Sequence, residues 1–140
     1  LLVGTPSGYN SWASANGIGS ESGSDDHDKD GIANAVEWVL GGNPNASDTG
    51  KLPSVSTTGG NLVFTFIRSQ SSKTPDTAVS IEVGTTLAGW PSVYTVGSDT
   101  AGSSAGVTVT DNGNGTDTVV LTVTRAPDVA KFARLKVSVN

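Results

Sequence analysis

The chain has 140 residues, of which 15% are charged and 35% hydrophobic, and its formal net charge is −5. The eight Lys and Arg residues are scattered, so the sequence lacks the basic patch that binding to nucleic acid or to an anionic membrane surface requires. No segment approaches the roughly 20 apolar residues of a membrane-spanning helix. We therefore expect no nucleic-acid partner and no membrane insertion.

The residue types present favour an all-β chain. The sequence contains 18 Gly and 6 Pro, and Ser, Thr, Val and Asn fill much of the remainder. Such a composition favours short strands joined by turns over packed helices. The length suits one domain, which at this size needs no disulfides to fold, and the chain has no Cys.

The N-terminal part, residues 1–50, starts with the apolar sequence Leu1–Val3 and contains one possible helical turn around Ser11–Asn16. A Gly/Ser-rich spacer follows, and acidic residues then crowd together up to Asp30. The apolar start suits pairing, as an added strand, with a sheet edge of a neighbouring copy. The alternative is that it forms an edge strand of its own sandwich or is frayed.

Residues 26–37 match the twelve-residue pattern of an EF-hand-type calcium loop, with acidic residues at the first, third, fifth and last positions. Alternate residues of a tight loop direct three carboxylates at one centre, and Gly31 permits the sharp turn that brings in a backbone carbonyl. A divalent cation also removes the repulsion between the carboxylates. The alternative is a solvated acidic loop beside a helix N-terminus. The residues expected to bind Ca²⁺ are Asp26, Asp28, Asp30, Ile32 through its carbonyl oxygen, Asn34 directly or through a water, and Glu37; weaker candidates are Asp25, Asn43 and Asp48.

The loop runs into a predicted helix, Ile32–Leu40, whose apolar residues recur at the spacing of one helical face. Gly41, Gly42 and Pro44 end it, as glycine at the end of a helix and proline beyond it usually do.

From about residue 51 the apolar residues alternate with a period of two, which predicts strands. The Asn- and Gly-rich sequence Asp111–Gly115 between two such runs predicts a hairpin turn. The fold expected is an antiparallel β-sandwich of about seven strands over residues 51–140, preceded by the EF-hand-like loop and short helix and compact with them. The expected strands are Asn61–Arg68, Ala78–Val83, Val107–Thr110, Thr118–Thr124 and Ala133–Val139, with weaker ones near Lys51–Thr57 and Val93–Gly97.

The stretch from Asp26 to Trp38 reads D-x-D-x-D-G-x-x-N-x-x-E-W and is followed by Gly41-Gly42-Asn43-Pro44. This arrangement resembles the calcium-loop and β-sandwich modules of secreted and surface proteins from verrucomicrobial and planctomycete-type bacteria. The loop alone also resembles thrombospondin type 3, dockerin and EF-hand repeats. The resemblance implies a non-catalytic extracellular module; Asn43 departs from the Asp that such modules often carry there.

Two functions are expected from these features. The first is a non-catalytic, calcium-stabilised structural protein of the cell surface, either a self-associating subunit of a filament or coat, joined through residues 1–8, or a terminal module of a secreted protein. An enzyme is not expected, because His27 is the only histidine and lies within the acidic loop. The second function is a carbohydrate-binding or adhesion module, since Trp90 and Tyr94 lie in a turn-rich stretch and aromatic faces stack on sugars. The alternative for Trp90 is packing over the end of the sandwich.

Overall fold

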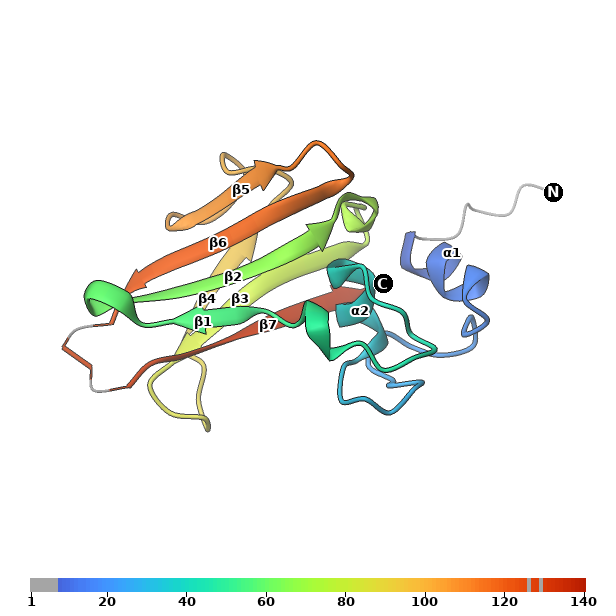
Figure 1. The fold of residues 1–140 in the computed structure, drawn as a ribbon, viewed down its shortest axis with the longest axis horizontal. Helices are drawn as coiled ribbons and strands as arrows, with labels where there is room; N and C mark the ends of the chain where they lie inside the picture. Colours follow the sequence, from blue (N-terminus) through green and yellow to red (C-terminus); the bar gives the residue numbers. More distant parts are fainter. Residues whose placement is uncertain (1–7, 126, 129) are drawn as a thin grey trace.

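The computed structural model describes residues 8–125, 127–128 and 130–140, without the side chain of Thr58. Its described part is mainly β, with seven strands in two antiparallel sheets packed face to face (Figure 1). This confirms the fold class predicted from the alternating apolar pattern. The helices are α1 (Gly8–Ala15) and α2 (Asn34–Leu40), and the strands are β1 (Ser54–Ser56), β2 (Asn61–Ser69), β3 (Thr77–Gly84), β4 (Ser92–Val96), β5 (Val107–Asp111), β6 (Thr116–Thr124) and β7 (Phe132–Val139).

The larger sheet has the strand order β1-β2-β6-β5 and the smaller one the order β4-β3-β7. Alternation decides which side chains enter the space between them: in β2, Leu62, Phe64 and Phe66 are buried, whereas the residues between them are more exposed. The hairpin turn between β5 and β6 lies where the sequence predicts it. Gly113 and Gly115 in this turn have φ values of 76° and 87°, which glycine adopts without strain.

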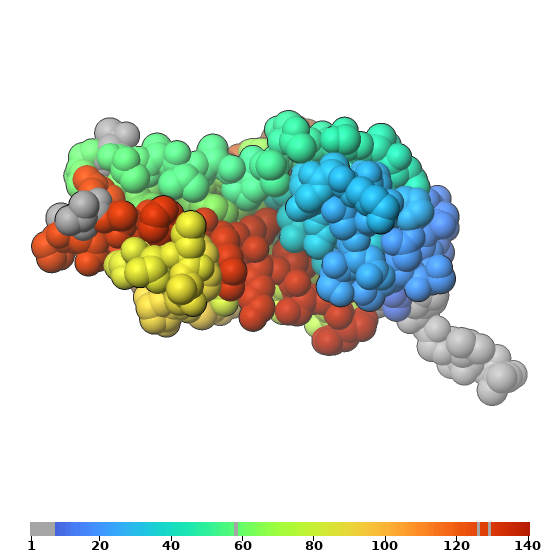
Figure 2. Space-filling model, turned by 90° about the horizontal axis from the view of Figure 1, so that it is seen from below, coloured from blue at the N-terminus to red at the C-terminus, as the bar shows by residue number. Residues whose placement is uncertain are grey.

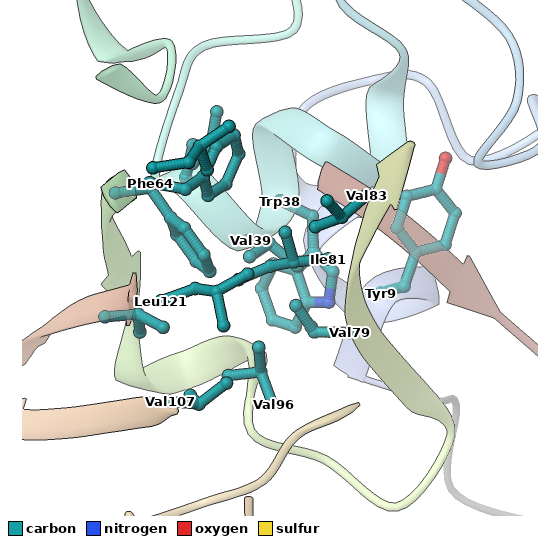
Figure 3. Packing of buried hydrophobic residues seen from close by; sticks show 14 of the residues in the cluster. Tyr9, Trp38, Val39, Phe64, Val79, Ile81, Val83, Val96, Val107 and Leu121 are labelled. Carbon is teal, nitrogen blue, oxygen red and sulfur yellow. The ribbon is translucent and has the colours of Figure 1, made fainter. Parts of the chain in front are cut away.

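The N-terminal part covers one end of the sandwich, where α1, the acidic loop and α2 lie together (Figure 2). One hydrophobic cluster joins them to the sheets, so residues 8–50 share a core with the strands. In Figure 3, Trp38 and Val39 of α2 lie beside Ile81 and Val79 of β3. The indole Nε1 of Trp38 donates a hydrogen bond to Thr77 Oγ1 at 3.2 Å, which fixes α2 on the start of β3.

Helix α2 begins at Asn34, two residues later than the apolar pattern predicts. The backbone N–H of Ile32 is taken by the Asp30 carboxylate, and Ala33 is extended, so these residues still belong to the loop. The helix ends as predicted: Gly41 adopts the left-handed conformation, and the N–H of Gly42 donates to the Glu37 carbonyl. Among the residues that the structure describes, no helix is long and apolar enough to cross a membrane.

Candidate metal centre

Asp26, Asp28 and Asp30 each direct one carboxylate oxygen toward a shared centre, and these three atoms lie within 4.8 Å of one another. Backbone N–H groups of the loop hold the side chains in place. Gly31 donates to Asp26 Oδ2 at 2.9 Å and Asp30 donates to Asp28 Oδ1 at 3.2 Å. The alternating spacing thus produces the convergence expected from the sequence, and this cluster could hold a metal ion.

Two residues of the loop have positive φ angles. Gly31, at φ 90°, makes the turn that the pattern assigns to it, and Lys29 adopts the left-handed conformation at φ 60°. The side chains of Lys29 and His27 lie on the solvent side of the loop. The Nδ1 atom of the His27 ring pairs with the Glu21 carboxylate rather than with the aspartates of the loop.

Glu37 on α2 lies close enough to the cluster for the charges of all three aspartates to act on it. The residue is only 2% exposed, yet neither of its carboxylate oxygens has a hydrogen-bond partner. Asp26 Oδ1 and Asp28 Oδ2 are likewise buried and unpaired. Because an unpaired buried carboxylate is costly, these four oxygens, on residues whose charges act on one another, are donors suited to a cation.

The electrostatics of the cluster support this interpretation. Burial, and then the charges of Asp28, Asp30, Asp26 and Asp48, raise the pKa of Glu37 to about 8. Burial and the neighbouring Asp30 raise the pKa of Asp28, whereas the backbone N–H of Asp48 lowers that of Asp30. In the described part of the chain, no Lys or Arg forms an ion pair with these carboxylates. The cluster therefore lacks the positive charge that would balance it.

Asn34 is the first residue of α2, where the loop ends, and it is fully buried. Its Oδ1 accepts a hydrogen bond from the His27 N–H at 3.2 Å, and its Nδ2 donates to the Ser22 carbonyl at 3.3 Å. These bonds make Asn34 a brace between the loop and the segment before it. A role for Asn34 or for the Ile32 carbonyl as a metal ligand stays a prediction.

The three weaker candidates differ in position. The Asp25 carboxylate accepts from the Ser22 N–H, and the Asn43 side chain accepts from the Asn45 N–H, so both are engaged in local turns. Asp48 instead donates its backbone N–H to Asp30 Oδ2 at 3.0 Å, and its charge acts on Glu37. Of the three, only Asp48 contacts the cluster.

The Gly/Ser-rich spacer before the loop holds the loop against α2. The Gly23 carbonyl accepts from the Ala35 N–H at 2.9 Å, and the Asp25 carbonyl accepts from the Asn34 N–H at 2.8 Å. A Cβ at Gly23 would lie 2.6 Å from Val139 and 2.8 Å from Ala35, so only glycine fits between β7 and α2. Sequence reasoning missed this role because nothing in the spacer identifies which glycine is enclosed.

A second buried polar cluster, also missed from sequence, lies between the sheets. Asp117 on β6 accepts from Arg68 on β2 at 2.8 Å, from Lys73 at 2.6 Å and from Gln70 at 2.8 Å. Arg68 also donates to the Gly97 carbonyl, which follows β4. Burial raises the pKa of Asp117, but hydrogen bonds from Lys73, Gln70 and Arg68 outweigh it and hold that pKa below its usual range. Through Arg68, which bonds both Asp117 and the Gly97 carbonyl, this cluster fastens one sheet to the other.

The aromatic residues considered for sugar binding are partly covered. The Arg134 guanidinium lies 4.3 Å from the centre of the Trp90 ring and also pairs with Glu82 at 2.8 Å. Tyr94 is half-buried and packs against the core. One face of Trp90 is thus occupied by the protein's own side chain.

Comparison with protein-family models, with curated proteins and with solved structures found no match. The resemblance to bacterial calcium-loop modules therefore stays a prediction.

Proposed function

We propose that this chain is a non-catalytic, calcium-stabilised structural module of an extracellular protein. The observation that carries the proposal is Glu37, a buried carboxylate with two unpaired oxygens beside three converging aspartates. No group among the described residues satisfies these oxygens, whereas a bound divalent cation would. The role of the ion is to fix the loop and α2 on the end of the sandwich.

Calcium suits the donors better than other common metals. Every available side-chain donor in the cluster is a carboxylate oxygen, and Ca²⁺ takes roughly six to eight such hard ligands in irregular geometry. Zinc favours thiolate and imidazole ligands, but the chain has no Cys, and His27 is turned toward Glu21. Magnesium demands near-octahedral geometry and retains several waters, which suits a buried two-oxygen contact from Glu37 less well.

A stabilising role fits the single loop better than a sensing role. Sensor proteins pair their loops so that two helices open on binding, whereas here α2, the helix that directly follows the loop, is packed into the core through Trp38 and Val39. Extracellular sites of this kind bind at roughly 0.1–1 mM. At 100-fold excess over the dissociation constant, the ion adds about 2.7 kcal/mol to the free energy of unfolding.

Thermal unfolding with calcium and with chelator tests the proposal. We expect calcium to raise the melting temperature by several degrees, and we expect Asp28→Asn to abolish most of this rise. Asp99→Asn is the matched control, because Asp99 caps a distant turn through the Gly102 N–H, which an Asn oxygen also accepts. Identical melting curves with and without calcium would contradict the proposed role.

The structural role includes self-association. The support is the apolar sequence Leu1–Val3, which lies outside the described residues, together with the exposed apolar side chains on the sandwich. Light scattering on the full chain and on a chain lacking residues 1–7 tests it; equal masses at every concentration would count against association through this segment. We do not extend the proposal to carbohydrate binding, because Arg134 covers the Trp90 ring and Tyr94 packs on the core.

A further inference from the structure

The two flanks of the sandwich, where the edges of the sheets meet, differ in how they are closed. On the flank of β4 and β5, the loop of residues 97–106 bonds to both edge strands. Ser104 donates its N–H to the Thr95 carbonyl at 3.0 Å, and the Thr95 N–H donates to Ser104 Oγ at 2.8 Å. Thr100 Oγ1 accepts from the Val109 N–H at 2.8 Å. The chain itself seals this flank.

The opposite flank, formed by β1 and β7, has no such cover. Strand β7 is eight residues long and pairs with β3 on one side only, and β1 on the facing sheet is three residues long and exposed throughout. Among the described residues, no loop is hydrogen-bonded to the outer edge of β7. Figure 2 looks onto this flank and shows β7 running beside β1 at the surface. Away from Val139, where Gly23 and α2 lie over the strand, this free edge presents a row of unpaired backbone groups.

An apolar groove of about 310 Å³ lies between the two strands. The inward side chains of β7 remain half-exposed, whereas those of its neighbour β3 are buried. On the β1 side, Leu52 and Val55 are 49% and 50% exposed. The core is therefore incompletely covered along this flank. The residues that line the groove include Val36, Leu52, Val55, Phe64, Ala133 and Leu135.

We propose that this groove is the acceptor site for the segment Leu1–Ser7 of a second copy of the chain, which pairs with β7 as an added strand. This inference rests on the proposed self-association and names the surface that it uses. The segment has three consecutive apolar residues and no charged side chain. An added strand directs alternate side chains into the groove and satisfies the free β7 edge with its backbone.

The chain's own segment is poorly placed to fill the same groove. A Cβ at Gly8 would lie 2.4 Å from Thr74, so the described chain starts at the end of the sandwich where β7 finishes. Gly23 and α2 lie over β7 at that end, since the space at Gly23 is bounded by Val139 and Ala35. Seven residues span at most about 25 Å when fully extended. Ala133, which lines the groove, is paired with Val83 of β3, six residues beyond Thr77. The groove therefore lies roughly 20 Å along the strand from the end where Thr77 pairs with Val139. The fully extended segment thus exceeds this distance by only about 5 Å, which leaves little length for a detour over Gly23 and α2.

Disulfide trapping tests the proposal directly, because the natural chain has no Cys. Leu2→Cys and Val55→Cys are made as separate full-length variants, mixed, oxidised and analysed on a non-reducing gel. Val93→Cys is the matched control for the acceptor. Val93 is 58% exposed, but it lies on β4 and does not line the groove. We expect Leu2→Cys to form a linked heterodimer with Val55→Cys at least tenfold faster than with Val93→Cys.

Equal rates with the two acceptors, or no linked heterodimer with Val55→Cys, would overturn the proposal. A chain carrying both Leu2→Cys and Val55→Cys supplies the other readout: a linked monomer at every dilution would show that the segment fills its own groove. Light scattering of the wild type shows whether a negative trapping result rejects only the groove or also the proposed self-association. Association without trapping at Val55 rejects the groove alone, whereas a monomer at all concentrations rejects self-association and leaves the calcium site to the melting experiment.

Discussion

The replacement Glu37→Gln separates two effects of one carboxylate, its repulsion by the aspartates and its binding of the ion. In chelator the wild type folds with Glu37 largely protonated, so folding must take up a proton that the unfolded chain has released. With a pKa that rises from 4.5 to about 8 in the fold, this costs about 3 kcal/mol at pH 7 and about 1 kcal/mol at pH 5. Because the folded pKa is raised, the metal-free wild type loses stability as the pH rises between these values, and the variant does not.

The expected result is therefore a pH-dependent difference. In chelator, the stability of Glu37→Gln relative to the wild type increases by about 2–3 kcal/mol between pH 5 and pH 7. This difference does not depend on the desolvation cost of the new amide, which is the same at both pH values. Calcium at 100-fold excess shifts this difference at pH 7 in favour of the wild type by up to about 2.7 kcal/mol, because the variant lacks the two-oxygen ligand and gains little from the ion.

Urea unfolding followed by tryptophan fluorescence gives the four free energies of unfolding. Glu82→Gln is the control: Glu82 is also a buried carboxylate, but it is paired with Arg134 on the smaller sheet, so its response to calcium should equal that of the wild type. The reasoning is refuted if Glu37→Gln keeps the full calcium response, or if its difference from the wild type in chelator is the same at pH 5 and pH 7.

Three further perturbations probe the support of the site and the core. Asp117→Asn leaves the Arg68 and Lys73 charges without their buried partner and should lower the free energy of unfolding by about 3–5 kcal/mol at neutral pH, measured by urea unfolding. Since the pKa of Asp117 is depressed, the deficit should shrink as the pH falls through that value; a constant deficit down to pH 2 would contradict the assignment. Gly23→Ala places a methyl group against Val139 and Ala35 and should cost about 1–3 kcal/mol, whereas Gly50→Ala, where the nearest contact is 4.0 Å, should cost less in the same melting assay. Gly31→Ala puts a side chain at φ 90° and should weaken calcium binding in a titration, although no neighbour lies within 4 Å of the new methyl group; unchanged affinity would show that the loop adapts.

The sequence predicts local features of this protein well. The convergence of Asp26, Asp28 and Asp30 follows from their spacing within one tight loop, so no knowledge of the remaining chain is needed. The strands follow similarly from alternation, because a side chain two positions along a strand returns to the same face. Even the hairpin at Asp111–Gly115 depends only on residues that are neighbours in the chain.

Features formed between distant segments could not be predicted in this way. Arg68 and Asp117 are 49 residues apart in the chain, and only the register of β2 with β6 brings them together. Arg134 on β7 reaches Trp90 in the turn-rich stretch before β4, and it covers one face of a ring that the sequence alone leaves open to a ligand. Asn34 fits the ligand pattern, but its amide is engaged by His27 and Ser22 once the preceding segment folds back. Each of these needs tertiary pairing, which composition and periodicity do not encode.

The loop of residues 97–106 bears on how copies of this chain would join into an assembly. The loop bonds to Thr95 and Val109 on the flank of β4 and β5, so under the proposed strand addition β7 is left as the acceptor. A copy that gives a segment at one end and receives another along one side makes head-to-tail contacts, which produce rings or open helical fibres rather than two-dimensional layers. An open fibre of this kind has a direction, and its two ends differ: one presents a vacant groove and the other an unused segment.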